Sequence, residues 1–153
     1  MYELYGQLIL ATVLGAIVGL ERQVSKKAAG MRTFALVSLG AAFFTIISIM
    51  AMDLYPASSA IDVTRIPAQI VLGVGFIGAG LIIFHRSHIT GLTTAAGLWV
   101  ASAIGMAVGF KLYLPAIFTA ILVFVIFVIF WFIENKFVNK LAGTPSEQEL
   151  ENR

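Results

Sequence analysis

The chain has 153 residues, of which 59% are hydrophobic and only 12% are charged, and its mean hydropathy is +0.96. Soluble proteins carry about a quarter charged residues, so this composition excludes an ordinary soluble domain and indicates an integral membrane protein. The sequence contains no cysteine, which excludes disulfides, iron–sulfur clusters and thiol catalysis.

Five apolar segments of about 17 to 22 residues predict five transmembrane helices, since each can cross a hydrocarbon core of about 30 Å. The segments are residues 4–20, 33–52, 66–84, 92–110 and 112–133. A lipid-exposed segment must pair its backbone polar groups internally, so all five are expected to be helical. The last two would together measure about 60 Å as one helix. Gly109, Lys111 and Pro115 therefore predict a tight turn between them, and the fold class is an all-α bundle of five transmembrane helices.

The distribution of Lys and Arg predicts the orientation of the chain. Eight basic residues fall in the first loop, the third loop and the C-terminal tail: Arg22, Lys26, Lys27, Arg32, Arg86, Lys136, Lys140 and Arg153. Only Arg65 and Lys111 fall on the other side, so we expect the N-terminus outside and the C-terminus in the cytoplasm. No basic region precedes the first span, which is expected to be an uncleaved insertion signal. Residues 1–135 form the predicted transmembrane domain, and residues 136–153 form a short polar cytoplasmic tail.

Small residues spaced four apart predict close contacts between helices. They are Ala11, Gly15 and Gly19 in the first span, Gly75 and Ala79 in the third, and Gly97, Ala101, Gly105 and Gly109 in the fourth; the third span also has Gly73, Gly78 and Gly80. We expect the first four helices to form a close inner bundle and the bulky fifth helix to face lipid. Packing alone explains these glycines; an ion path or a helix hinge is the alternative. The glycines of the third span also spell the GxGxxG dinucleotide fingerprint, but a nucleotide site is not predicted because the motif lies inside an apolar span.

Candidate functional side chains gather at the predicted cytoplasmic ends of the helices. They are Glu21, Arg22, Arg32, Thr33, Arg86, Thr93 and Thr94. Four helix ends converge there, which could bring Glu21 beside Arg32 or Arg86. The span centres hold only hydroxyls and amides, for which hydrogen bonds between helices are the simpler role. Lys26 and Lys27 are expected only to orient the loop.

Metal binding and catalysis have weak support in the sequence. His85 and His88 are three apart, but no third ligand is near, so a solvated loop is expected. Asp53 and Asp62 flank the outer loop and could attract a divalent cation only weakly. No nucleophile–base–acid arrangement is visible. We therefore expect a non-enzymatic protein without a cofactor, and Mg²⁺ stays open as a ligand.

Three blocks of sequence, taken together and in order, resemble the membrane domain of the MgtC/SapB family over roughly residues 4–135. The blocks read GLERQ…AGMRTFALVSLGAA, RIPAQIVLGVGFIGAGLIIF and GLTTAAGLWVASAIGMAVG. The family pattern maps onto Glu21, Arg22, Gly30, Arg32, Thr33, Gly73, Gly75, Gly78, Gly80, Gly91, Thr93, Thr94 and Trp99. Longer members add a soluble ACT-like domain after the last helix. The sequence stops about twenty residues past that helix, so we expect a member of the short, SapB-like branch without that domain.

The resemblance implies a bacterial inner-membrane protein. Longer relatives are linked to growth in low magnesium, survival inside phagocytes and acid adaptation, and the family is regarded as modulating other membrane machinery, including the proton-driven ATP synthase. The leading hypothesis is a homo-oligomeric modulator of magnesium or proton homeostasis, or of a partner membrane complex. The alternative is a transporter or channel for Mg²⁺ or another cation, formed by an oligomer. Nucleic acid is not an expected partner, because the basic residues lie in loops beside the spans.

Overall fold

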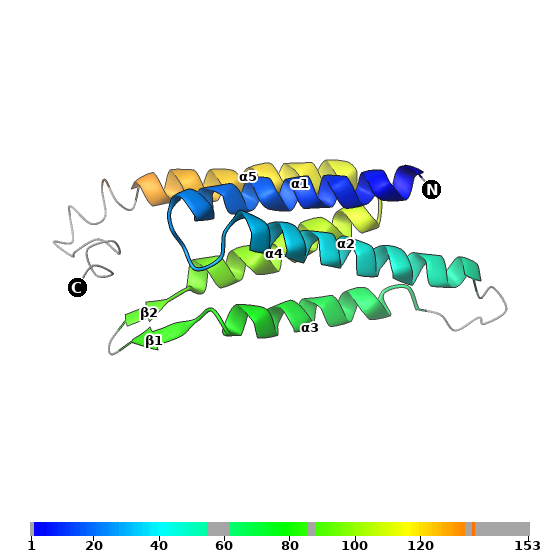
Figure 1. Ribbon diagram of the computed structural model, residues 1–153, viewed down its shortest axis with the longest axis horizontal. Helices are drawn as coiled ribbons and strands as arrows, with labels where there is room; N and C mark the ends of the chain where they lie inside the picture. Colours follow the sequence, from blue (N-terminus) through cyan, green and yellow to red (C-terminus); the bar gives the residue numbers. More distant parts are fainter. Residues whose placement is uncertain (1, 55–61, 86–87, 134–135, 137–153) are drawn as a thin grey trace.

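The computed structural model describes residues 2–54, 62–85, 88–133 and 136, with the side chains of Asp53 and His85 excepted. Its elements in chain order are α1 (Tyr2–Val24), α2 (Met31–Leu54), α3 (Arg65–Ala79), β1 (Ile83–His85), β2 (His88–Thr90), α4 (Leu92–Gly109) and α5 (Tyr113–Ile133) (Figure 1). The predicted all-α membrane bundle of five helices is confirmed. By length and composition, α1, α2, α4 and α5 can each cross a membrane.

The connections between helices lie alternately at the two ends of the bundle, as a chain that crosses a membrane five times requires. The loop from α1 to α2, the β-hairpin and the C-terminal end of α5 lie at one end, while the N-terminus and the turn from α4 to α5 lie at the other (Figure 1). That turn is tight, as predicted: α4 ends at Gly109, Lys111 has a φ of 63° and α5 begins at Tyr113.

The prediction for the third span, residues 66–84, is wrong at its C-terminal end. Helix α3 has 15 residues, or about 22 Å at 1.5 Å per residue, and residues beyond Gly80 leave the helix. The chain instead forms an antiparallel hairpin in which Ile83 pairs with Thr90 and His85 pairs with His88. Glycines weaken the end of the helix, and the β-branched and aromatic residues that follow favour an extended backbone. Strand pairing then satisfies the backbone groups that a continued helix would have paired.

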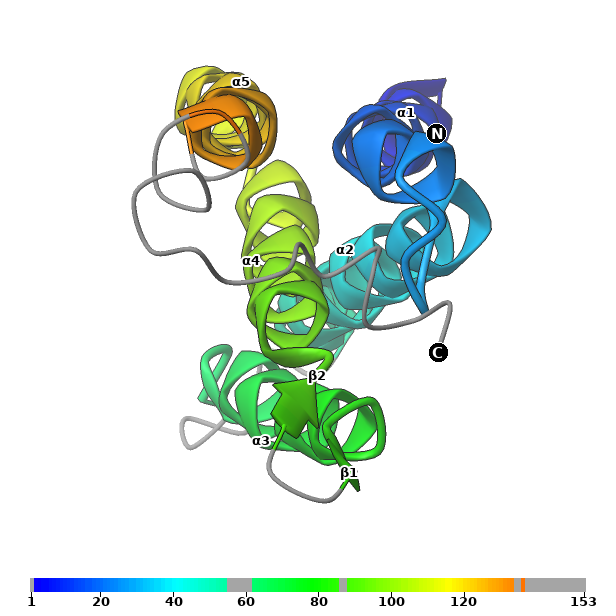
Figure 2. The same cartoon turned by 90° about the vertical axis from the view of Figure 1, so that its left-hand side faces the viewer.

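Helix α4 is the centre of the molecule. The end-on view in Figure 2 shows α4 surrounded by α1, α2, α3 and α5. Its buried residues Leu98, Ile104 and Val108 are at most 1% exposed. The core continues into α1 through Val18 and into α2 through Phe34, both completely buried. The hydrophobic core therefore lies where α1, α2 and α4 meet.

The outer helices α3 and α5 contribute far less to this core. Helix α5 buries one stripe of four residues, Ala116, Ala120, Val123 and Phe127, and exposes most of its other bulky side chains. That pattern agrees with the expected lipid-facing role of α5. Helix α3 buries only Pro67, Val74 and Gly78, so the expectation that it would join a close inner bundle is wrong. It lies at the edge of the molecule, beside α4 (Figure 2).

Candidate functional site

The backbone of α2 is held between α1 and α4 at three small residues. A Cβ added to Gly15 would lie 2.6 Å from the carbonyl oxygen of Phe34 and 2.7 Å from the Cβ of Ser38. A Cβ added to Gly105 would overlap the carbonyl oxygen of Ser38. One turn along α1, a Cβ added to Gly19 would lie 2.8 Å from the Cα of Met31. These glycines permit backbone-to-backbone contact in the way small residues do in membrane helices.

The other glycines predicted from the sequence lie in varied surroundings. A Cβ added to Gly97 would lie 2.7 Å from the ring of Phe127, and one on Gly30 would meet the side chain of Gln23. Gly91 has a φ of 87°, which a residue with a Cβ rarely adopts. On α3, Gly78 makes only an ordinary contact with Ala95 on α4, at 3.5 Å, and the Cβ position of Gly80 lies 3.4 Å from a carbonyl of its own helix. Added Cβ atoms on Gly73 and Gly75 would have no neighbour within 4 Å.

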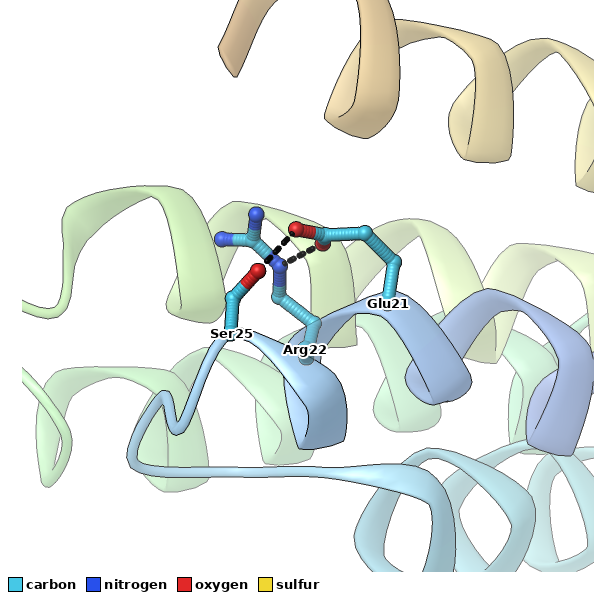
Figure 3. Close-up of polar contacts among 3 residues, drawn as sticks. All are labelled: Glu21, Arg22 and Ser25. Carbon is cyan, nitrogen blue, oxygen red and sulfur yellow. Dashed lines mark hydrogen bonds and ion pairs between the residues drawn. The ribbon is translucent and has the colours of Figure 1, made fainter. Parts of the chain in front are cut away.

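A buried ion pair closes the C-terminal end of α1. The Nε of Arg22 lies 2.5 Å from Oε2 of Glu21, and the hydroxyl of Ser25 donates to Oε1 of Glu21 at 2.7 Å (Figure 3). The Arg22 and Glu21 side chains are only 4% and 9% exposed. The Arg22 guanidinium also lies 4.2 Å from the centre of the Phe127 ring on α5. We call Glu21, Arg22, Ser25 and Phe127 the ion-pair cluster.

The local sequence explains why these charges can be buried. Glu21 and Ser25 are four residues apart and so lie on one face at the end of α1, while Arg22 is in the last turn, where the helix dipole favours a cation. Both carboxylate oxygens of Glu21 have a partner, and the aromatic face supplies a further attraction for the guanidinium. Burying a charge is costly unless it is paired and hydrogen-bonded.

Packing around Phe127 joins the cluster to the rest of the bundle. Phe127 meets the ring of Phe34 on α2 edge-on, with centroids 6.5 Å apart and an interplanar angle of 84°. Both rings lie against the Gly97 backbone of α4. One charged pair at the end of α1 is thus in contact, directly or through one aromatic ring, with α2, α4 and α5.

The other predicted functional residues do not join this cluster. Glu21 pairs with its neighbour Arg22, whereas Arg32 is exposed at the start of α2 and, with Thr33, lines a groove between α2 and α3. Thr94 is buried in the first turn of α4, Thr93 is exposed, and Trp99 is 50% exposed. Arg86 and the tail beyond Lys136 lie outside the described residues. The predicted polar face is therefore divided between two sites.

Sequence reasoning missed two members of the cluster, Ser25 and Phe127. The four-residue spacing from Glu21 to Ser25 is a signal that could have been used. Phe127 has no such signal, because it is one of many large apolar residues on α5 and only the tertiary packing selects it.

Polar side chains within the bundle mainly form hydrogen bonds with the backbone of their own helix. The hydroxyls of Thr12, Thr45 and Ser102 donate to carbonyls of their own helices at 2.7–2.8 Å, rather than across helices as expected. Gln7 and Ser48 are exceptions: the Nε2 of Gln7 donates to the carbonyls of Val108 and Gly109 at the end of α4, and the Oγ of Ser48 donates to the carbonyl of Val63, just before α3. Within the described residues, the Oγ of Ser38 and the Oε1 of Gln7 are buried without a partner.

Charged residues at the opposite end of the bundle are exposed. The Nζ of Lys111 lies 2.8 Å from Oε1 of Glu3, and this hydrogen bond raises the pKa of Lys111. Hydrogen bonds from Thr64 lower the pKa of Asp62. His88 is exposed. Among the residues that the structure describes, no group of three or more His, Cys, Asp or Glu side chains is placed to hold a metal ion.

Comparison with known proteins gives matches over most of the chain. A model of the MgtC family matches residues 8–136. The "Putative magnesium transporter YhiD" of Escherichia coli K12 is 39% identical over 140 residues, which cover 88% of this chain and 63% of the relative. "Protein SapB" of Bacillus subtilis is 41% identical over 110 residues, 70% of this chain and 47% of the relative. "Protein MgtC" of Salmonella typhimurium is 39% identical over 123 residues, 80% of this chain and 50% of the relative.

The chain spans from about half to 63% of the length of these curated relatives. No solved structure matches it.

Proposed function

Since the chain belongs to the MgtC family, we propose that it is a non-enzymatic, multi-pass bacterial membrane protein that modulates magnesium or proton homeostasis by acting on a partner membrane complex under low-magnesium or acid stress. The observation that carries this proposal is the closed centre of the bundle. Gly15 and Gly105 bring the backbones of α1 and α4 against Ser38 of α2. This contact supports a scaffold rather than a conduit through one chain.

The placement of charge supports the same proposal. Ionisable groups inside a membrane commonly mark an ion or proton pathway. Here the buried charges of Glu21 and Arg22 lie at one end of the bundle and are already paired with each other. The hydroxyls of Thr45 and Ser102, deeper in the bundle, are engaged by carbonyls of their own helices. The end that carries the ion-pair cluster is therefore the surface at which we place the interaction with a partner.

Family resemblance suggests the class of partner, the proton-driven ATP synthase, and self-association is a further part of the proposal. We place self-association on the outer face of α3, where Leu72 and Phe76 are 70% and 84% exposed. Gly75 is also exposed, with open space at its Cβ position. Small residues let a second helix approach closely.

A cation transporter is the second candidate. The name of the E. coli relative, "Putative magnesium transporter YhiD", favours it. An oligomer could multiply one carboxylate into a ring at a pore, and Glu21 is the buried carboxylate that could serve. Magnesium usually binds one or two carboxylates and keeps several of its waters.

Flux measurements on the purified protein distinguish the two candidates. Liposomes would carry a magnesium-sensitive dye and a pH-sensitive dye, with an imposed gradient of each ion. We expect wild-type protein to give rates equal to those of protein-free liposomes. The matched variants are Glu21→Gln and Glu3→Gln, since both carboxylates are on α1 but Glu3 is exposed at the other end. Magnesium flux that Glu21→Gln abolishes and Glu3→Gln retains would establish the transporter instead.

A further inference from the structure

A groove with a volume of about 910 Å³ lies between α2 and α3. One face of each helix lines it. The apolar walls include Leu36, Val37 and Phe44 on α2 and Ile66, Ile70 and Ile77 on α3. The volume lies in the range of about 300–1,000 Å³ that small-molecule sites occupy, and the apolar lining suits a hydrocarbon chain.

The length of the groove matches one leaflet of a bilayer. Along α2 its lining runs from Arg32 to Phe44, which is about 18 Å at 1.5 Å per residue. Half of a hydrocarbon core is about 15 Å thick. With Arg32 at the membrane interface, a groove of this length would extend over the depth that one acyl chain occupies.

The interfacial end of the groove is positively charged. Arg32 is exposed there, and within the described parts of the chain it has no ion-pair or hydrogen-bond partner. Thr33 lies beside it, and both residues are in the first turn of α2, where free backbone N–H groups and the helix dipole favour an anion. Arginine binds phosphate with two parallel hydrogen bonds. This charge complements the phosphate of a lipid headgroup.

Two glycines keep the groove open. Gly40 and Gly73 both line it, and an added Cβ on either would have no neighbour within 4 Å. Larger side chains at these positions would enter the groove without displacing protein atoms. The groove is therefore open because these two positions are glycine.

We propose that the groove between α2 and α3 binds one acyl chain of an anionic phospholipid, whose phosphate is held by Arg32 and Thr33. This ligand site is separate from the ion-pair cluster and does not depend on the proposed function. Along the groove, α2 and α3 make little contact with each other. An anionic lipid would fill the space between them and would hold α3 against the bundle.

Fluorescence quenching by brominated lipids tests the proposal. Trp99 and Trp131 would be replaced by Phe, and a single Trp introduced in the groove by Leu36→Trp. The protein would be reconstituted in phosphatidylcholine vesicles containing brominated phosphatidylglycerol or brominated phosphatidylcholine. We expect about a fivefold stronger apparent affinity for the anionic lipid, the effect of about one basic residue near the membrane surface. Phe130→Trp, on the exposed face of α5, should show no such preference.

Two pairs of matched variants locate the site. Arg32→Gln should abolish the preference for phosphatidylglycerol, whereas Arg65→Gln, at the start of α3, should retain it. Gly73→Leu should reduce quenching of the groove Trp by both lipids. Gly6→Leu, on α1, is its control, because that position is equally open but does not line the groove.

Three outcomes would overturn the proposal. The first is equal quenching of the groove Trp by the two brominated lipids, and the second is a preference that Arg32→Gln leaves unchanged. The third is exclusion of both lipids together with disulfide formation between copies carrying Leu36→Cys, which would assign the groove to a second copy of the chain.

Discussion

Two sides of this bundle use the same residue types in opposite ways. Where α1, α2 and α4 meet, Gly105 lies against the backbone of Ser38, and Arg22 is 4% exposed in an ion pair. Where α2 faces α3, Gly73 borders open space and Arg32 is exposed. On the packed side, the absence of a side chain at glycine lets two helix backbones touch. On the open side, the same absence leaves an empty groove. A glycine or an arginine in a membrane helix therefore has no fixed role until its neighbour is known.

The arginine pair should show the largest difference in stability. Arg22→Met leaves Glu21 buried without its partner, and breaking a buried pair costs about 3–5 kcal/mol. Arg32→Met removes an exposed charge and should leave the free energy of unfolding nearly unchanged. Denaturant titration in one detergent measures both variants. If Glu21→Gln combined with Arg22→Met restores no stability relative to Arg22→Met, the loss does not come from the unpaired carboxylate.

The glycine pair should show the next largest difference. A Cβ on Gly105 overlaps the Ser38 carbonyl, so Gly105→Ala should destabilise by about 1–3 kcal/mol through overpacking. Gly73→Ala meets open space and should stabilise by up to about 1 kcal/mol through helix propensity. Thermal unfolding in detergent compares the two. Similar melting temperatures for both variants would mean that the contact between α2 and α4 is looser than described.

The glutamine pair extends the comparison with a smaller effect. Gln7 is 2% exposed and donates to carbonyls at the end of α4, so Gln7→Leu should cost about 1 kcal/mol, as a hydrogen bond between membrane helices does. Gln69 is exposed and lines the groove, so Gln69→Leu should have no resolved effect. The same denaturant titration applies, and a cost at Gln69 equal to that at Gln7 would contradict the assignment.

The ion pair between Lys111 and Glu3 should have the smallest effect, because both side chains are more than half exposed. The hydrogen bond to Glu3 raises the pKa of Lys111. Its contribution to stability is therefore fully present below the ordinary lysine pKa and is lost as the pH rises through the raised value. Melting temperatures of wild-type protein and Lys111→Met, measured from pH 8 to 11, should converge at the alkaline end. A difference that grows with pH would have the wrong sign.

Much of the fold could be predicted from the sequence, because span length and the turn at Lys111 are local properties. The end of α3 could not: residues 80–84 are apolar enough for a span, and their strand pairing depends on a partner segment at residues 88–90. The peripheral place of α3 was also missed, since Gly75 and Ala79 on α3 have the same four-residue spacing as the small residues of α4. The spacing of small residues shows that another helix can approach closely, but it does not show which helix does so.

The candidate site was predicted only in part. The importance of Glu21 and Arg22 as an acid and a base at the end of a span could be inferred from the sequence, but their mutual pairing could not. Arg32 is close in sequence, yet the loop between α1 and α2 places it on the groove side of α2. The relative orientation of two helices decides which basic residue pairs with an acidic residue at their ends.

Cysteine accessibility tests most directly the claim that the centre of the bundle is closed. The chain has no native cysteine, so Ser102→Cys, at a position 1% exposed on α4, and Ala28→Cys, on the exposed loop, can each carry a single thiol. In membrane vesicles open to reagent on both sides, a charged, water-soluble methanethiosulfonate should modify Ala28→Cys rapidly. It should modify Ser102→Cys only after unfolding. Equal rates at the two positions in the folded protein would reveal a water-filled path through the bundle and contradict this account.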